Sequence, residues 1–225
     1  MDPRQETAFW DSIDALERAS VLPHVLIIGS WAEYLYTFHF DASYVPIIRT
    51  RDVDLLYPWI RRPAKPIDLE RMMRDAGFVV VRDSHTQAVK LLKEDLLEIE
   101  FLTRQIGAGR DPVIDIPAIG MRGQALRDVN LLAEHPMVLE AKEHQILVPE
   151  PAVYVLQKIL IHPHRVPAWK KEKDLESVRG LMPFIRNIPH DLSCWHEAVS
   201  GLSDKERSVL QRVAVEQFLD IPVLE

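Results

Sequence analysis

The chain has 225 residues, of which 47% are hydrophobic and 27% are charged, as is typical of a globular protein with a sizeable core. Its net charge of −7 argues mildly against an extended basic surface for nucleic acid. The single cysteine excludes an internal disulfide and fits a reducing compartment, and no apolar run is long enough to span a bilayer. We therefore expect a cytoplasmic protein with no membrane partner.

The first two thirds of the chain are predicted to mix helices and strands. Apolar residues at helical spacing predict an amphipathic helix over residues 7–19. An apolar run at residues 24–28 predicts a buried strand, and a helix is predicted over 31–38. The further strands expected are 50–57, 78–82, 88–93, 96–103, 113–116, 137–140 and 145–148, and the further helices are 67–76 and 126–132.

The last third of the chain is predicted to be entirely helical. Helices are expected over residues 152–161, 168–181, 192–201 and 203–218, with prolines between them. The fold class is therefore α+β. We expect a mixed β-sheet core with helices in a domain over residues 1–150, followed by a helical C-terminal region over residues 151–225.

A Gly-Ser pair follows the first predicted strand directly. Gly29 allows the backbone to turn closely. Ser30 is expected to cap a helix that begins at Trp31, and the free N–H groups of such a helix can face a phosphate.

Two aspartates alternate with apolar residues in the next strand. Residues two apart in a strand point to the same face, so Asp52 and Asp54 are expected side by side, with Val53 and Leu55 opposite. Two such carboxylates repel each other unless a cation lies between them, and magnesium prefers oxygen ligands. The alternative is a solvated strand edge, against which the apolar neighbours argue.

Gly29–Ser30 followed by Asp52-x-Asp54 resembles the DNA polymerase β-type nucleotidyltransferase superfamily. The longer string Thr50–Leu56, with the later string Tyr154–Lys158, is similar to a bacterial family of nucleotidyltransferase-fold proteins whose substrate is undefined. The resemblance implies the fold of that superfamily and two-metal chemistry at the aspartates, with Mg²⁺ or Mn²⁺ as cofactor.

The implied reaction moves a nucleoside monophosphate from a nucleoside triphosphate to an acceptor hydroxyl and releases pyrophosphate. The sequence does not identify the acceptor, which can be a small molecule, a protein or an RNA. One alternative is a non-catalytic nucleotide-binding or interaction module, against which an intact set of carboxylates argues. Another is a toxin-like nucleotidyltransferase that modifies tRNA, and the acidic net charge argues mildly against it.

The third carboxylate of such a site is expected on a neighbouring strand. Glu98 and Glu100 share one face of the strand predicted at 96–103. Glu100, between Ile99 and Phe101, matches the superfamily's third position best, although aspartate is commoner there. Glu98 is the alternative ligand, and an exposed strand face is the alternative for both.

Three residues after position 150 are candidates for binding the nucleotide. Lys158 interrupts an apolar helix, so it either reaches outward to solvent or points into a site, and the resemblance favours the site. Its ammonium is then expected to face the Gly29–Ser30 turn, and Lys158→Met should weaken triphosphate binding with little loss of stability. Lys173 and Asp174 resemble a Lys-Asp pair of toxin-type nucleotidyltransferases, and are candidates for nucleotide contact and for orienting Lys158. The alternative is a charged, exposed turn.

Cys194 is predicted to have a packing role, because it stands beside Trp195 in a predicted helix.

Overall fold

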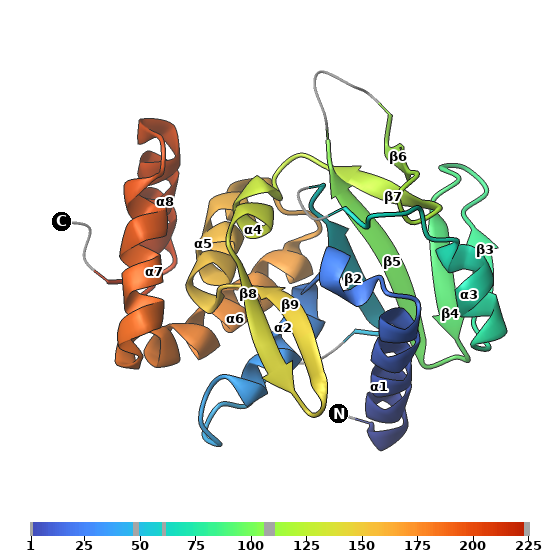
Figure 1. Ribbon diagram of the computed structural model, residues 1–225. Helices are drawn as coiled ribbons and strands as arrows, with labels where there is room; N and C mark the ends of the chain where they lie inside the picture. The colour runs from blue at the N-terminus through green and yellow to red at the C-terminus, as the bar shows by residue number, and fades with distance from the viewer. Residues whose placement is uncertain (1, 47–49, 60–61, 106–110, 223–225) are drawn as a thin grey trace.

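The computed structural model describes residues 2–46, 50–59, 62–105 and 111–222 (Figure 1). Within these ranges one mixed sheet contains β1 (Leu26–Ile28), β2 (Asp52–Tyr57), β3 (Val79–Arg82), β4 (Val89–Lys93), β5 (Leu97–Arg104), β6 (Val113–Ile116) and β7 (Met121–Leu126). The strand order is β1–β2–β5–β4–β3, with β7 also paired to β5 and β6 paired to β7.

Strand β5 is the centre of this sheet. It runs parallel to β2 and to β7 and antiparallel to β4. Val53 and Leu55 of β2 are buried, as are Ile99 and Phe101 of β5, because these four side chains face the apolar side of the sheet. The acidic residues between them therefore face the other side.

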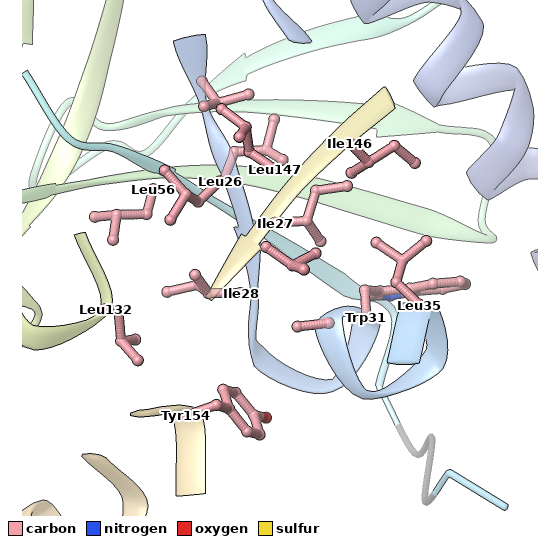
Figure 2. Packing of buried hydrophobic residues seen from close by; sticks show 14 of the residues in the cluster. Leu26, Ile27, Ile28, Trp31, Leu35, Leu56, Leu132, Ile146, Leu147 and Tyr154 are labelled. Atoms are coloured by element: carbon pink, nitrogen blue, oxygen red, sulfur yellow. The ribbon is translucent and has the colours of Figure 1, made fainter. Parts of the chain in front are cut away.

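A separate hairpin, β8 (Pro136–Ala141) and β9 (His144–Pro149), packs against β1. Figure 2 shows Leu26 and Ile27 of β1 in the same buried cluster as Ile146 and Leu147 of β9. This packing covers β1, which would otherwise be an open edge of the sheet.

The helices are α1 (Pro3–Arg18), α2 (Gly29–Leu35), α3 (Leu69–Asp75), α4 (Asn130–Glu134), α5 (Pro151–Ile161), α6 (Ala168–Asn187), α7 (Pro189–Ser200) and α8 (Asp204–Glu216). Short 3-10 turns lie at Leu22–His24, Tyr36–Phe38 and His162–His164. Helix α5 is buried along most of its length because it packs against α6, α7 and α8. Figure 1 shows α7 and α8 on the outside, with α5 and α6 between them and the sheet.

The α+β class and the helical C-terminal part are confirmed. The strand predicted from residue 24 begins at Leu26, because Pro23 lies in a 3-10 turn. The helix predicted to stop at residue 181 continues through Pro183, because the buried Met182 and Ile185 hold that stretch against the core.

Strand β7 was not predicted, because Gly123 and Ala125 occupy the positions that alternate with Arg122 and Gln124, and these small residues give only a weak strand signal. The helix expected at 126–132 begins only at Asn130. One hydrophobic cluster runs from α1 to beyond α8, and a folding boundary at residue 150 stays a prediction. No helix in the described part of the chain combines the length and the apolar character that crossing a bilayer requires.

Candidate active site

Four carboxylates lie together on the polar face of β2 and β5. The parallel register places Asp52 beside Glu98 and Asp54 beside Glu100. Carboxylate oxygens of Asp52, Glu98 and Glu100 lie within 4.8 Å of one another. The sheet therefore brings Asp52 and both candidates for the third carboxylate into one cluster, and Asp54 stands next to that cluster, opposite Glu100 in the register.

The Gly29 turn lies directly against Asp54. Strand β1 runs antiparallel to β2 and pairs Ile28 with Asp54, so the chain turns into α2 beside this carboxylate. Gly29 has a φ of +67°, and a Cβ atom there would lie 2.5 Å from Asp54 Oδ2. Glycine is required both for the left-handed backbone and for the close approach of the carboxylate.

Ser30 does not have the role that was predicted for it. Helix α2 begins at Gly29, Ile28 precedes it in an extended conformation, and no side chain caps the helix. The prediction that Ser30 caps a helix beginning at Trp31 is wrong, because the left-handed Gly29 already turns the chain into the helix. Ser30 lies buried in the first turn.

We expect Gly29→Ala to destabilise the protein by about 2–4 kcal/mol. The left-handed backbone and the overlap with Asp54 each contribute about 1–2 kcal/mol or more. Urea unfolding measures the change. Gly180→Ala is the matched control, because a Cβ atom meets nothing within 4 Å at that position in α6 and alanine favours the helix. Equal stability of the two variants would contradict this account of Gly29.

Asp54 is a carboxyl group in an unfavourable environment. Burial raises its pKa to about 7, and the negative charges of Glu100 and Asp52 act in the same direction. Lys173 and Arg165 lower the pKa and oppose this shift. The carboxylate form of Asp54 therefore lacks compensating positive charge, which a divalent cation would provide.

The metal-free protein should lose stability as the pH rises from about 4 to about 7. In this interval native Asp54 keeps its proton while the unfolded chain, with a pKa near 3.8, has released it. Each unit of pKa difference is worth about 1.4 kcal/mol, so the loss reaches a few kcal/mol. Urea unfolding at pH 5 and pH 8 measures it. Asp54→Asn is the control, and parallel pH profiles of the two proteins would contradict the assignment.

Lys90 is a member of the cluster that the sequence did not reveal. The antiparallel register pairs Lys90 of β4 with Glu100 of β5. Its Nζ atom lies 2.5 Å from Glu100 Oε1 and also forms an ion pair with Glu98. Desolvation lowers the pKa of Lys90, but hydrogen bonds to Glu100 and Glu98 raise it above its ordinary value. The ammonium thus compensates part of the charge of the two glutamates.

Lys158 lies in a second, buried group of charges beside the first. Its Nζ atom is 2.7 Å from Asp174 Oδ1 and 3.6 Å from Glu33 Oε1, and its side chain is 11% exposed. Arg165 Nε lies 3.0 Å from the other oxygen of Asp174. Asp174 therefore holds Lys158, whose ammonium is already paired with carboxylates of the protein.

Glu33 joins this buried group to the Gly29 turn. Its carboxylate is 1% exposed and accepts hydrogen bonds from the hydroxyls of Tyr154, at 2.8 Å, and Ser177, at 2.6 Å. The Tyr154 hydroxyl also lies 2.9 Å from the carbonyl oxygen of Gly29. Helices α5 and α6 thereby fix the position of the turn.

Lys173 is half-buried and differs from Lys158 in having no partner of this kind. It forms no ion pair with any other residue in the described ranges. Burial lowers its pKa and so does the positive charge of Lys158, while Glu33, Asp174 and Asp54 act in the opposite direction. Lys173 is therefore an ammonium that acts electrostatically on Asp54 and forms no ion pair within the described residues.

A family model described as nucleotidyltransferase matches residues 8–198 of the sequence. The chain belongs to this nucleotidyltransferase family. It is therefore a transferase, and membership implies a nucleoside triphosphate as substrate. None of the curated proteins matches this member of the family.

One solved structure has the same fold, and a second is similar at a lower score. The crystal structure of an antigenic nucleotidyltransferase-like protein from Paracoccidioides brasiliensis matches with a TM-score of 0.56 and 16% identity, over 92% of this chain and 88% of that one. The solution structure of the antibiotic-resistance factor ANT(2'')-Ia matches with a TM-score of 0.44 and 13% identity, over 97% of this chain and 95% of that one.

Proposed function

We propose that the protein transfers a nucleoside monophosphate from a nucleoside triphosphate to an acceptor hydroxyl and releases pyrophosphate. The observation that carries this proposal is the cluster of carboxylates on β2 and β5, next to the Gly29 turn. Oxygen ligands gathered on one rigid sheet face suit a divalent cation that binds phosphate oxygens.

Asp52, Asp54 and Glu100 are the residues we propose to hold Mg²⁺ or Mn²⁺. Such an ion fits the site, because carboxylate oxygens of Asp52 and Glu100 lie with one of Glu98 within 4.8 Å of one another, and Asp54, which is paired with Glu100 in the register, lacks compensating charge. Glu100 is preferred to Glu98 because it stands beside the partly buried Asp54, whereas Glu98 stands beside the exposed Asp52. When bound, the ion would stabilise negative charge on the phosphoryl oxygens.

The cations of the protein complete the proposed nucleotide site. Lys173 would donate hydrogen bonds to phosphate oxygens, because its ammonium forms no ion pair with any residue that the structure describes and acts on Asp54. The ion pair between Lys158 and Asp174 would hold helices α5 and α6 together behind Lys173. Gly29 and Ser30 would lie against the phosphates, where the absence of a side chain at Gly29 leaves room beside Asp54.

A labelling experiment tests the proposal and separates its alternatives. Each α-labelled nucleoside triphosphate is incubated with the protein, Mg²⁺ or Mn²⁺ and a cell extract, and the products are separated after protease or ribonuclease treatment. Label in a small molecule, protein or RNA identifies the acceptor class, and label in tRNA would support the toxin-like alternative. Triphosphate binding without label transfer or pyrophosphate release would favour the non-catalytic module.

The two glutamates are distinguished by conservative variants. We expect Glu100→Gln to abolish transfer while triphosphate binding is largely kept, and Glu98→Gln to have a smaller effect. The reason is the register, which places Glu100 rather than Glu98 beside Asp54. Transfer rates and nucleotide titrations of both variants are the measurement. An inactive Glu98→Gln protein with an active Glu100→Gln protein would reverse the assignment.

A further inference from the structure

A second cluster of metal-binding side chains lies away from the carboxylates, where α7 meets the start of α5. Glu150 immediately precedes α5, and His190 and Cys194 stand one helical turn apart on α7. One ligand atom from each of the three lies within 4.8 Å of the other two. We propose that Glu150, His190 and Cys194 bind Zn²⁺ or a chemically similar divalent transition metal. This site is independent of the proposed nucleotidyl transfer.

The spacing of the three ligand atoms fits a tetrahedral ion. His190 Nε2 lies 3.6 Å from Glu150 Oε2 and 3.6 Å from Cys194 Sγ. Zinc bonds of about 2.0–2.1 Å to nitrogen and oxygen and about 2.3 Å to sulfur place neighbouring ligands about 3.3–3.6 Å apart. The side chains are therefore already at ligand separation. Helix geometry explains part of this, because residues i and i+4 face the same side.

Without an ion, the cluster leaves a buried carboxylate oxygen unsatisfied. Glu150 is 15% exposed at its side chain, and its Oε2 atom has no hydrogen-bond partner within the described residues. His190 Nε2 faces both Glu150 and Cys194, but a ring nitrogen carries at most one hydrogen and cannot serve both. A cation among the three atoms would satisfy all of them at once.

The surroundings define the fourth ligand and the kind of metal. Asp191, the next residue of α7, is fully buried and is occupied by His39 Nε2 at 2.9 and 3.1 Å, so it is not a ligand. His190 is 65% exposed, so water reaches the site and can fill the fourth position. Sulfur and nitrogen donors select zinc-like ions over magnesium, which distinguishes this site from the carboxylates on β2 and β5.

Binding would tie the junction of β9 and α5 to the outer helix α7. The thiol of Cys194 would lose its proton to solvent as the sulfur–metal bond forms, so one proton is released for each ion bound. No electron is transferred. The expected consequence is a higher melting temperature in Zn²⁺ than in a chelator, since the ion binds the native arrangement of two segments about 40 residues apart in sequence.

Cobalt titration of the full-length protein tests the proposal. A thiolate bound to Co²⁺ absorbs in the near ultraviolet, and Cys194 is the only cysteine of the chain, so any such band reports on this site alone. We expect the band in the wild type, its displacement by Zn²⁺, and its loss in Cys194→Ser. His190→Asn should weaken Zn²⁺ binding at least about tenfold, because even residues behind the ligands have effects of this size.

His196→Asn is the matched control, because His196 is an exposed histidine on the same helix and lies outside the cluster. It should keep both the band and the affinity. Circular dichroism of metal-free Cys194→Ser shows whether that variant is folded, and Asp54→Asn should retain the band even if nucleotidyl transfer is lost. Absence of the band in the wild type, or equal Zn²⁺ affinity of the wild type and His190→Asn, would overturn the proposal.

Discussion

Replacing Asp54 by asparagine is expected to lower the rate of nucleotidyl transfer by about a thousandfold or more. Asparagine keeps the size of the side chain and its fit against Gly29, but it removes the charge that would hold a divalent cation. A bound cation is worth several kcal/mol of stabilisation of the reacting phosphoryl group, and each 1.36 kcal/mol changes the rate tenfold.

Two measurements separate loss of metal from loss of structure in this variant. Calorimetric titration with Mn²⁺ should show weaker binding to Asp54→Asn than to the wild type, while urea unfolding at pH 8 should show equal or greater stability. The stability should not fall, because burial of the carboxylate is unfavourable above its pKa of about 7. Equal Mn²⁺ affinity in both proteins would remove Asp54 from the proposed metal site.

The sequence predicts which residues share a face of a strand, because side-chain alternation depends only on neighbouring residues of the same strand. Asp52 and Asp54 share a face for the same reason that Glu98 and Glu100 do, and each pair lies within one short segment. The register between the two strands is not local. That Asp54 faces Glu100 follows from pairing between segments more than 40 residues apart, which the sequence pattern alone does not determine.

The residues that were missed are those whose role depends on distant packing. Glu33 stands in a short helix where a glutamate usually faces solvent, yet it is buried because Tyr154 and Ser177, at separations of 121 and 144 residues, donate hydrogen bonds to it. Lys90 is one polar residue in an alternating strand. Its only sequence signal is the hairpin, which places it opposite Glu100 once the register is known.

The structure also changes what is expected of Lys158. The sequence predicts a triphosphate ligand, so that Lys158→Met would barely affect the protein without nucleotide. In the structure the ammonium is paired with Asp174 and lies 3.6 Å from the buried carboxylate of Glu33. Removing it leaves two buried carboxylates with insufficient positive charge, because Arg165 contacts only Asp174 among them.

We therefore expect Lys158→Met to lower the free energy of unfolding by about 3–5 kcal/mol in the absence of nucleotide, which is typical of breaking a buried ion pair from one side. Urea unfolding near pH 7 measures the loss. The double variant Lys158→Met/Asp174→Asn should recover part of it, because the second change removes one of the carboxylates left without a partner.

Lys173→Met is the matched control, because it removes the neighbouring ammonium that forms no ion pair within the described residues. It should leave stability nearly unchanged and weaken triphosphate binding by about 1.5–3 kcal/mol, the range for a hydrogen bond to a charged group. These results would give the two lysines different roles: Lys158 would stabilise the packing of the helices behind the site, and Lys173 would bind phosphate. If Lys158→Met were instead stable and bound nucleotide more weakly, Lys158 would be assigned to phosphate binding, as the sequence predicts.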